Sequence, residues 1–212
     1  MLTKTSNGFQ VNKKIILFLN GEPPIHFPDT RIYEKIYCTD GSYDYLINHG
    51  IQPDVVTGDF DSIQSKNFSE NVRIIHTPDQ YFTDFEKIMK VIVDDGYKTV
   101  DIYGASGRQQ DHYIGNLNAA YKFKEHLNIT FFDNYSVYYF LDKINKISNV
   151  RGKTISLLPF PNANGINTKG LLYPLENGAL NLLGTIGTRN KAIESDIEIT
   201  FENGELIIFI IN

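Results

Sequence analysis

Two aspartates, separated by a single residue, stand at the end of a short apolar run. The run at residues 55–58 leads into Asp59 and then Asp61, and alternate side chains of an extended chain point to the same side. Two carboxylates held that close repel each other unless a cation lies between them. Mg²⁺ bound to carboxylates and to the phosphates of a substrate is the usual solution. The pair therefore predicts metal-assisted chemistry on a phosphorylated substrate.

Three more acidic residues follow predicted strands or open predicted helices. Asp40 ends an apolar run, while Asp84 and Asp111 stand at the starts of two helical patterns. Ligands of an open parallel sheet bind at the carboxyl ends of its strands, so we expect these carboxylates to meet at one edge of a sheet. Taken alone, Asp84 could be a first-turn acid stabilised by the helix dipole, and Asp111 could be a helix N-cap.

The loop at residues 104–107 is a candidate phosphate cradle. It brings Gly104, Ser106 and Gly107 together ahead of a predicted helix, and small residues there let free backbone N–H groups approach an anion. His112 and Asn116 lie one turn apart on that helix, so both side chains could reach the same cleft.

The elements that must position these residues alternate over the first two thirds of the chain. Helical patterns separate short apolar runs, which lie at residues 15–19, 36–39, 55–56, 72–75, 100–103 and 129–132. Such runs are typical of strands in a mainly parallel sheet that helices cover on both faces.

Two helices are marked by their sequence patterns. Thr83 and Glu86 form a capping box, in which each side chain bonds the backbone N–H of the other residue. The apolar positions that follow share one helix face and are predicted to be buried: Phe85, Ile88, Met89 and Ile92. A second helix is predicted from Asp111 to about Lys124, with an inner face made of Ile114, Leu117, Ala120 and Tyr121.

The last third of the chain changes character, because short strand-like segments replace the helical patterns. The final two segments flank Asn203-Gly204, a dipeptide that predicts a hairpin between them. We therefore expect a flexible N-terminus at residues 1–11, an α/β domain with a mainly parallel sheet at residues 12–134, and a smaller all-β sandwich domain at residues 135–212.

Composition excludes several classes of protein. The 212 residues are 42% hydrophobic, as in globular rather than disordered chains. A net charge of −5 gives no reason to expect nucleic acid or an anionic membrane as a partner. No apolar run approaches the roughly 20 residues of a membrane span, and the single cysteine, Cys38, excludes an internal disulfide framework. We expect a soluble, cytoplasmic protein.

Taken in order, the motifs resemble those of the thiamine pyrophosphokinases over nearly the whole chain. The matching segments are residues 40–42, 58–62, 79–87, 104–112 with Asn116, 170–175 and 187–190. The resemblance implies an α/β N-terminal domain, a β-sandwich C-terminal domain, and a homodimer with active sites between the subunits. It implies transfer of the terminal pyrophosphate of ATP to the hydroxyl group of thiamine, giving thiamine diphosphate and AMP.

The resemblance also implies roles for individual residues. Mg²⁺ would be held by Asp59, Asp61 and Asp84, which together with Asp111 make up the catalytic set. The residues implied to bind ATP and its phosphates are Asp40, Gly104, Ser106, Gly107, Arg108, His112 and Asn116. The residues implied to bind thiamine are Gln80, Thr83, Tyr173, Thr188 and Asn190, and the ring of Tyr173 would stack on the cationic thiazolium.

Three positions depart from the family pattern. Tyr81 replaces an aspartate, so that position cannot supply a metal ligand. Gln109 stands where the family has an arginine, and Arg108 occupies the preceding glycine position. Arg189 replaces a serine and could supply positive charge for a phosphate instead.

Other functions compete with this interpretation. In a phosphatase of the haloacid dehalogenase type, Asp59 would be the nucleophile, Asp61 the acid/base, and Asp94 with Asp95 the metal ligands. An Asp-x-Asp nucleotide-sugar transferase is a weaker option. A non-catalytic thiamine-binding protein would explain the substitutions at Tyr81 and Arg189.

Overall fold

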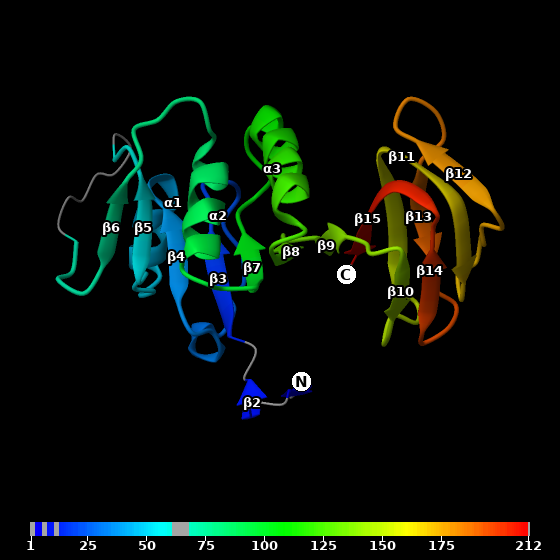
Figure 1. Cartoon of the computed structure of the whole chain (residues 1–212), viewed down its shortest axis with the longest axis horizontal. Helices are drawn as coiled ribbons and strands as arrows, with labels where there is room; N and C mark the ends of the chain where they lie inside the picture. The colour runs from blue at the N-terminus through cyan, green and yellow to red at the C-terminus, as the bar shows by residue number, and fades with distance from the viewer. Residues whose placement is uncertain (1–2, 6–7, 11–12, 61–67, 212) are drawn as a thin grey trace. The chain divides into compact units, whose positions relative to one another are not determined.

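The computed structural model of the protein describes residues 3–5, 8–10, 13–60 and 68–211 (Figure 1). It divides into two compact units, Met1–Asn134 and Tyr135–Asn212. Asp61 lies outside the described residues, so its predicted role is not tested by the structure. None of the helices within the described ranges is both long and apolar enough to cross a membrane.

A sheet of six parallel strands forms the centre of the first unit. The strands are β3 (Lys14–Phe18), β4 (Ile36–Thr39), β5 (Val55–Gly58), β6 (Arg73–His76), β7 (Thr99–Tyr103) and β8 (Asn128–Phe132). Their order in the sheet is β8-β7-β3-β4-β5-β6, and each neighbouring pair is parallel. The chain first adds strands on one side of β3 and then returns to its other side with β7. The carboxyl end of β3 is therefore the point where the winding direction reverses, which is where such sheets bind ligands.

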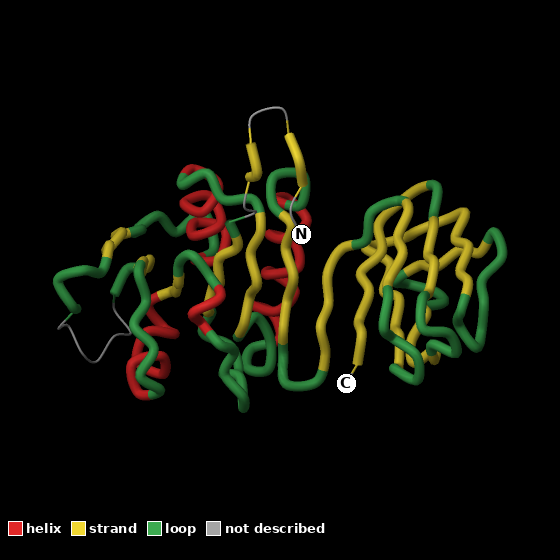
Figure 2. The backbone as a smooth tube through the Cα atoms, turned by 90° about the horizontal axis from the view of Figure 1, so that it is seen from below, coloured by secondary structure: helices red, strands yellow, loops and turns green. Residues whose placement is uncertain are grey.

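Helices lie on both faces of this sheet (Figure 2). They are α1 (Asp40–Asn48), α2 (Asp84–Asp94) and α3 (Gln110–Phe123), with a short 3₁₀ helix, η1, at Thr30–Ile32. Tyr43 and Leu46 of α1 pack in one cluster with Ile16, Phe18 and Cys38. Alternate strand residues face the opposite side, where α2 contacts β8 through the rings of Phe85 and Phe131.

The predictions for α2 are confirmed and those for α3 are partly wrong. Thr83 caps α2 in a complete capping box, and all four apolar residues of the predicted stripe are buried. On α3, Leu117 and Ala120 are buried, but Ile114 and Tyr121 are 58% and 40% exposed. Small residues such as Ala119 let α3 approach its neighbours along a narrow stripe, and helical spacing alone does not locate the centre of that stripe.

The N-terminal segment expected to be flexible contains two short antiparallel strands, β1 (Thr3–Thr5) and β2 (Gly8–Gln10). Their pairing satisfies backbone hydrogen bonds that a frayed terminus leaves to water.

The second unit consists of antiparallel strands around one long strand. The strands are β9 (Ser136–Phe140), β10 (Ile144–Ile147), β11 (Thr154–Lys169), β12 (Gly178–Asn181), β13 (Gly187–Lys191), β14 (Ile197–Thr200) and β15 (Asn203–Ile211). Most of β11 pairs with β15, β13 and β12, whereas its last residues pair with β14, which in turn pairs with β10. One strand thus takes part in two sets of pairings, and both bury apolar residues in a single core cluster.

The hairpin predicted at Asn203-Gly204 is wrong. These two residues begin β15 and pair with Asn164 and Ala163 of β11, while β14 pairs elsewhere. A Cβ atom at Gly204 would lie 2.0 Å from the carbonyl oxygen of Asn162, so the glycine allows a close approach of two backbones. An Asn-Gly pair serves this purpose as well as a turn, and the local sequence does not distinguish the two.

Asp95, directly after α2, ties the edge strand β6 to the interior of the sheet. Arg73 of β6 donates to both carboxylate oxygens at 2.7 and 2.9 Å, and the hydroxyl group of Tyr37 donates at 2.7 Å. Burial raises the pKa of Asp95, but the hydrogen bonds from Tyr37 and Arg73 outweigh it, so the pKa lies below its ordinary value. The charged form of Asp95 therefore stabilises the fold, and this contribution is lost as the pH falls through the folded-state pKa.

We predict that Arg73→Met lowers the free energy of unfolding at pH 7 by about 1 kcal/mol, since one charge-assisted and partly exposed hydrogen-bonded pair is lost. The difference from the wild type should shrink as the pH falls through the lowered pKa of Asp95, because protonation of the wild-type carboxylate removes its ion pair with Arg73. Chemical denaturation at several pH values measures both effects. Lys169→Met, which removes an exposed ion pair with Glu198, is the control and should change little. A difference that is independent of pH would contradict the assigned role of Asp95.

Candidate active site

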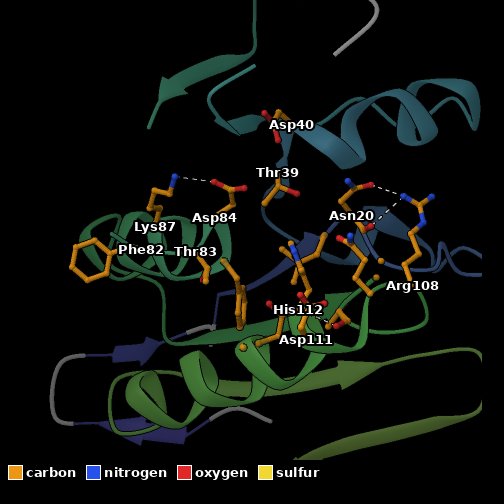
Figure 3. Close-up of a pocket in the computed structure, with 18 of the residues that line it drawn as sticks. Asn20, Thr39, Asp40, Phe82, Thr83, Asp84, Lys87, Arg108, Asp111 and His112 are labelled. Carbon is orange, nitrogen blue, oxygen red and sulfur yellow. Dashed lines mark hydrogen bonds and ion pairs between the residues drawn. The ribbon is translucent and has the colours of Figure 1, made fainter. Parts of the chain in front are cut away.

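A cavity of about 760 Å³ lies in the first unit, beyond the carboxyl ends of β3, β4, β5 and β7 (Figure 3). Residues that directly follow these strands line it, as expected for the point where the winding of the sheet reverses. The predicted site residues that line it are Asp40, Asp59, Gln80, Thr83, Asp84, Gly104, Ser106, Arg108, Asp111, His112 and Asn116. Residues far apart in the sequence therefore meet around one space.

Asp40 occupies the first turn of α1 and is nearly buried. Its carboxylate accepts hydrogen bonds from the backbone N–H groups of Gly41 at 2.7 Å and Phe60 at 2.9 Å. Burial raises the pKa of Asp40, these two donors partly offset it, and the charges of Asp84 and Asp59 raise it further. The charges of Asp84 and Asp59 thus act on Asp40, and a cation among these carboxylates would relieve that repulsion.

The turn after β5 is shaped by the contact with Asp40. A Cβ atom on Gly58 would lie 2.2 Å from the carboxyl carbon of Asp40, so only glycine fits at that position. Phe60 then adopts a left-handed conformation, with φ of 66°, which is strained for a bulky residue. The hydrogen bond from its N–H to Asp40 and ring contacts with Phe68 and His76 hold it there. This arrangement turns the chain directly after Asp59.

Asp84 and Lys87 form an ion pair at the start of α2. The Nζ atom of Lys87 lies 2.9 Å from Oδ1 of Asp84 and donates to the carbonyl oxygen of Thr77, also at 2.9 Å. Only 10% of the Lys87 side chain is exposed, compared with 54% for Asp84. Sequence reasoning did not assign Lys87 to the site, although it ends the matched segment at residues 79–87. A nearly buried ammonium group beside the acidic cluster supplies part of the charge balance.

The loop after β7 is braced by the loop after β3. Backbone N–H groups of Leu19, Gly21 and Glu22 donate to the carbonyl oxygens of Tyr103, Gly104 and Ser106 at 2.7–2.9 Å. A Cβ atom on Gly21 would lie 2.2 Å from the oxygen of Gly104, so the two loops are in direct backbone contact. Asn20, which was not predicted, lies within this contact and lines the cavity.

Helix α3 begins at Gln110, and Gln109 is its N-cap residue. Asp111 therefore lies in the first turn, and the alternative that it is the N-cap is wrong. Asn116 donates to the carbonyl oxygen of Ala105 at 2.8 Å, which fixes its side chain against the loop before the helix. Gly107 is not among the residues that line the cavity. Its left-handed conformation, with φ of 90°, turns the loop next to Glu22.

Two of the predicted residues of the second unit, Tyr173 and Asn190, are joined by hydrogen bonds. The N–H group of Tyr173 donates to Oδ1 of Asn190 at 3.1 Å, and Nδ2 of Asn190 donates to the carbonyl oxygen of Tyr173 at 2.7 Å. The side chain of Tyr173 is 68% exposed, so its ring is available to a ligand. Thr188 is exposed on β13, and the N–H group of Arg189 bonds the hydroxyl group of Ser156.

Two features of the site bear on a metal ion. Among the described residues, no three acidic, histidine or cysteine side chains are grouped so that they could hold one. Asp40, Asp59 and Asp84 nevertheless offer carboxylate oxygens in one cavity, and the charges of Asp59 and Asp84 act unfavourably on that of Asp40. Mg²⁺ prefers oxygen ligands and often needs only one or two carboxylates when phosphates complete its shell, so this donor set fits Mg²⁺ bound together with a phosphorylated ligand.

The metal ligands required by the phosphatase hypothesis are not in the cavity. Asp94 ends α2, and Asp95 is its C-cap residue, held by Arg73 and Tyr37. The cavity lies at the other end of α2, where Thr83 and Asp84 line it.

Comparison with known proteins identifies the same two units. The model of the thiamin pyrophosphokinase catalytic domain matches residues 32–131, and that of the thiamin pyrophosphokinase vitamin B1 binding domain matches residues 143–206. Thiamine pyrophosphokinase of Bacillus subtilis is 27% identical over 210 residues, which cover 92% of this chain and 97% of the relative. Thiamin pyrophosphokinase 1 of Caenorhabditis elegans is 25% identical, with 86% of this chain and 83% of the relative covered.

Solved structures share the fold over nearly the full length of the chain. The thiamine pyrophosphokinase of Bacillus subtilis has a TM-score of 0.81 at 24% identity, covering 93% of this chain and 99% of its own. The enzyme of Candida albicans has a TM-score of 0.80 at 21% identity, covering 94% and 89%.

We predict that Gly58→Ala reduces turnover on the order of 100-fold, because the added methyl group must displace the carboxylate of Asp40 from the cavity wall. The free energy of unfolding should fall by about 1–3 kcal/mol, as for other overpacked positions. Steady-state kinetics and thermal denaturation provide the two measurements.

Gly50→Ala is the matched control for this prediction. Gly50 is also left-handed, with φ of 71°, but a Cβ atom there would contact nothing within 4 Å. The strain should cost about 1 kcal/mol and leave turnover intact. Equal losses of turnover in both variants would contradict the assigned contact with Asp40.

Proposed function

This chain belongs to the thiamin pyrophosphokinase family, and on that premise we propose that it transfers the pyrophosphoryl group of ATP to the hydroxyl group of thiamine, giving thiamine diphosphate and AMP. The observation that carries the proposal is the cavity, which is lined by carboxylates, a lysine, an arginine and the loop after β7. Attack on the β-phosphorus requires an aligned hydroxyl group, neutralised phosphate charge and exclusion of water.

We assign Mg²⁺ binding to Asp59, Asp61 and Asp84, with Asp40 close by. Burial raises the pKa of Asp40 and the nearby charges of Asp84 and Asp59 raise it further, so a cation at this place would stabilise the charged carboxylates. When bound, Mg²⁺ neutralises the charge of the phosphates that it contacts. Lys87 holds Asp84 in place from the next turn of α2.

The phosphates of ATP are assigned to the other side of the cavity. Gly104, Ser106 and Gly107 form the loop that leads to the first turn of α3, where unbonded N–H groups favour anions. Arg108, His112 and Asn116 add side-chain donors to this surface. Asp111, in the same first turn, is assigned to orient the attacking hydroxyl group.

Thiamine is assigned to Tyr173, Thr188 and Asn190 in the second unit. The motifs also imply thiamine contacts for Gln80 and Thr83, which line the cavity of the first unit. The exposed ring of Tyr173 suits a cationic thiazolium, and the two hydrogen bonds with Asn190 hold its backbone still.

The proposed domain layout follows from these assignments. Residues 12–134 form the α/β domain that binds ATP and Mg²⁺, and residues 135–212 form a β-sandwich that binds thiamine. The participation of β11 in two sets of strand pairings supports a sandwich. A homodimer with shared active sites completes the proposal, and it rests on the resemblance of the motifs.

The test is incubation with ATP, Mg²⁺ and thiamine, followed by separation of the nucleotides and thiamine esters. We expect equal amounts of AMP and thiamine diphosphate. Formation of ADP and thiamine monophosphate would mean that the protein is a simple kinase and would contradict the proposal. Thiamine binding without formation of AMP would favour the non-catalytic alternative, which would explain the substitutions at Tyr81 and Arg189.

We predict that Asp84→Asn lowers kcat on the order of 100-fold or more, because one of the carboxylates assigned to hold the charge-neutralising Mg²⁺ is removed. The free energy of unfolding should change by less than about 1 kcal/mol, since Asp84 is half exposed. Asp94→Asn, at the exposed end of the same helix, is the matched control and should keep full activity. An inactive Asp94→Asn protein would instead revive the phosphatase hypothesis.

We predict that Tyr173→Ala raises the KM for thiamine about 3- to 30-fold, the range expected for loss of a cation–π contact. The KM for ATP should stay within twofold. Tyr173→Phe retains the aromatic face and should stay close to the wild type. A similar rise in both KM values would argue against a specific contact with thiamine.

A further inference from the structure

Arg108 stands one position before the place where the family motif has its arginine, yet its guanidinium group lies at the cavity (Figure 3). We infer that Asn20 is a positioning residue, which holds Arg108 so that it supplies the phosphate-binding charge missing at Gln109. The inference rests on the proposed function and names a residue that neither the motifs nor the family models assign.

The contact between the two side chains is direct. Nη1 of Arg108 donates to Oδ1 of Asn20 at 2.7 Å and to the backbone oxygen of Asn20 at 3.2 Å. Both acceptors are neutral, and within the described residues Arg108 forms no ion pair. The full positive charge therefore remains available to a ligand, which would not be true if a carboxylate held the arginine.

The guanidinium group keeps donors for that ligand. Arginine has five N–H groups in a planar fork. The hydrogen bonds to Asn20 both leave from Nη1, so Nη2 and Nε are left to face a phosphate. Two parallel hydrogen bonds from one guanidinium group are the strongest form of this recognition.

Asn20 is itself fixed by the backbone around it. The N–H groups of Leu19 and Gly21, on either side of it, donate to Tyr103 and Gly104. The carbonyl oxygen of Leu19 also accepts from the hydroxyl group of Tyr45 at 2.9 Å.

The side chain of Asn20 is packed as closely as its backbone. A Cβ atom on Gly41 would lie 2.3 Å from its Nδ2 atom, so the amide lies directly against the first turn of α1. A rigid residue thus restrains a long side chain, and the rotamer freedom of Arg108 is lost before ATP arrives rather than on binding.

Position 109 cannot take over this role. Gln109 occupies the N-cap position of α3 and lines the cavity, but its side chain carries no charge. The arginine side chain starts one position earlier than in the family motif. Its hydrogen bonds to Asn20 hold the guanidinium group at the cavity.

The test is a double-mutant cycle with Asn20→Ala, Arg108→Ala and the combined variant. Arg108→Ala should lower kcat/KM for ATP about 10- to 100-fold, as expected for a charge-assisted hydrogen-bonding pair. Asn20→Ala should lower it about 5- to 10-fold, and the combined variant should equal Arg108→Ala, because Asn20 acts only through Arg108. The KM for thiamine should stay unchanged in all three.

Asn20→Asp separates position from charge. The carboxylate keeps the shape and holds the arginine more tightly, but it neutralises the charge, so kcat/KM for ATP should fall as in Arg108→Ala. Wild-type kinetics in Asn20→Asp would overturn the inference. So would additive losses in the cycle.

Asn134→Ala is the control for a merely structural role. The side chain of Asn134 bonds the backbone of Ile25 and Pro23, in the same loop, without contacting Arg108. It should lower stability and leave kcat/KM for ATP unchanged. A loss in Asn134→Ala equal to that in Asn20→Ala would mean that Asn20 only supports the loop.

Failure of the proposed function would be visible separately, as an absence of AMP from the wild type. In that case the Kd for Mg·ATP of the same variants would be measured by calorimetry and compared in the same double-mutant cycle. Non-additive losses there would support the inference, and additive losses would overturn it.

Discussion

The charges of Asp84 and Asp59 add to the effect of burial in raising the pKa of Asp40. Neighbouring carboxylates destabilise the cavity unless cations balance their charge. The backbone around Asp40 holds its carboxylate in place. Gly58 leaves room for Asp40, and the N–H groups of Gly41 and Phe60 bond it. The strained backbone of Phe60 is kept in place by the same contact, so the turn after β5 and the start of α1 depend on each other.

The positive charges of the site are anchored in two different ways. Lys87 is nearly buried and bonds both Asp84 and a backbone carbonyl oxygen, so its charge is already used within the protein. Arg108 bonds only the neutral oxygens of Asn20 among the described residues, so its charge is left for a ligand. This division suits a site that has to keep its carboxylates in place and still attract phosphates.

The residues of the second unit that we assign to thiamine include two exposed side chains, those of Tyr173 and Thr188. Tyr173 is held by its backbone rather than by its ring, which leaves the aromatic face open. The long strand β11 supports this region, since it pairs with β13, where Asn190 lies. Rigid strands that carry exposed side chains are well suited to positioning a small ligand.

The sequence alone determined the kinds of element and the acidic motifs. Apolar runs without alternation marked the parallel strands, although the edge strand β6 is mostly exposed. The capping box of Thr83 and Glu86 located the start of α2. These features depend on neighbours within a few residues, which is why they can be read along the chain. The order of the motifs was enough to identify the family.

Only the tertiary structure decided which loops meet. Asn20 follows β3 and Arg108 follows β7, and they come together because these two strands are neighbours in the sheet. Neither residue type signals this contact, so Asn20 was missed, as was the burial of Lys87. The exposure of Ile114 and the pairing of Gly204 with β11 were decided in the same way. The spacing of residues along a chain indicates which side chains can lie on the same face of a helix or strand. Contacts between distant segments depend instead on the packing of the whole unit.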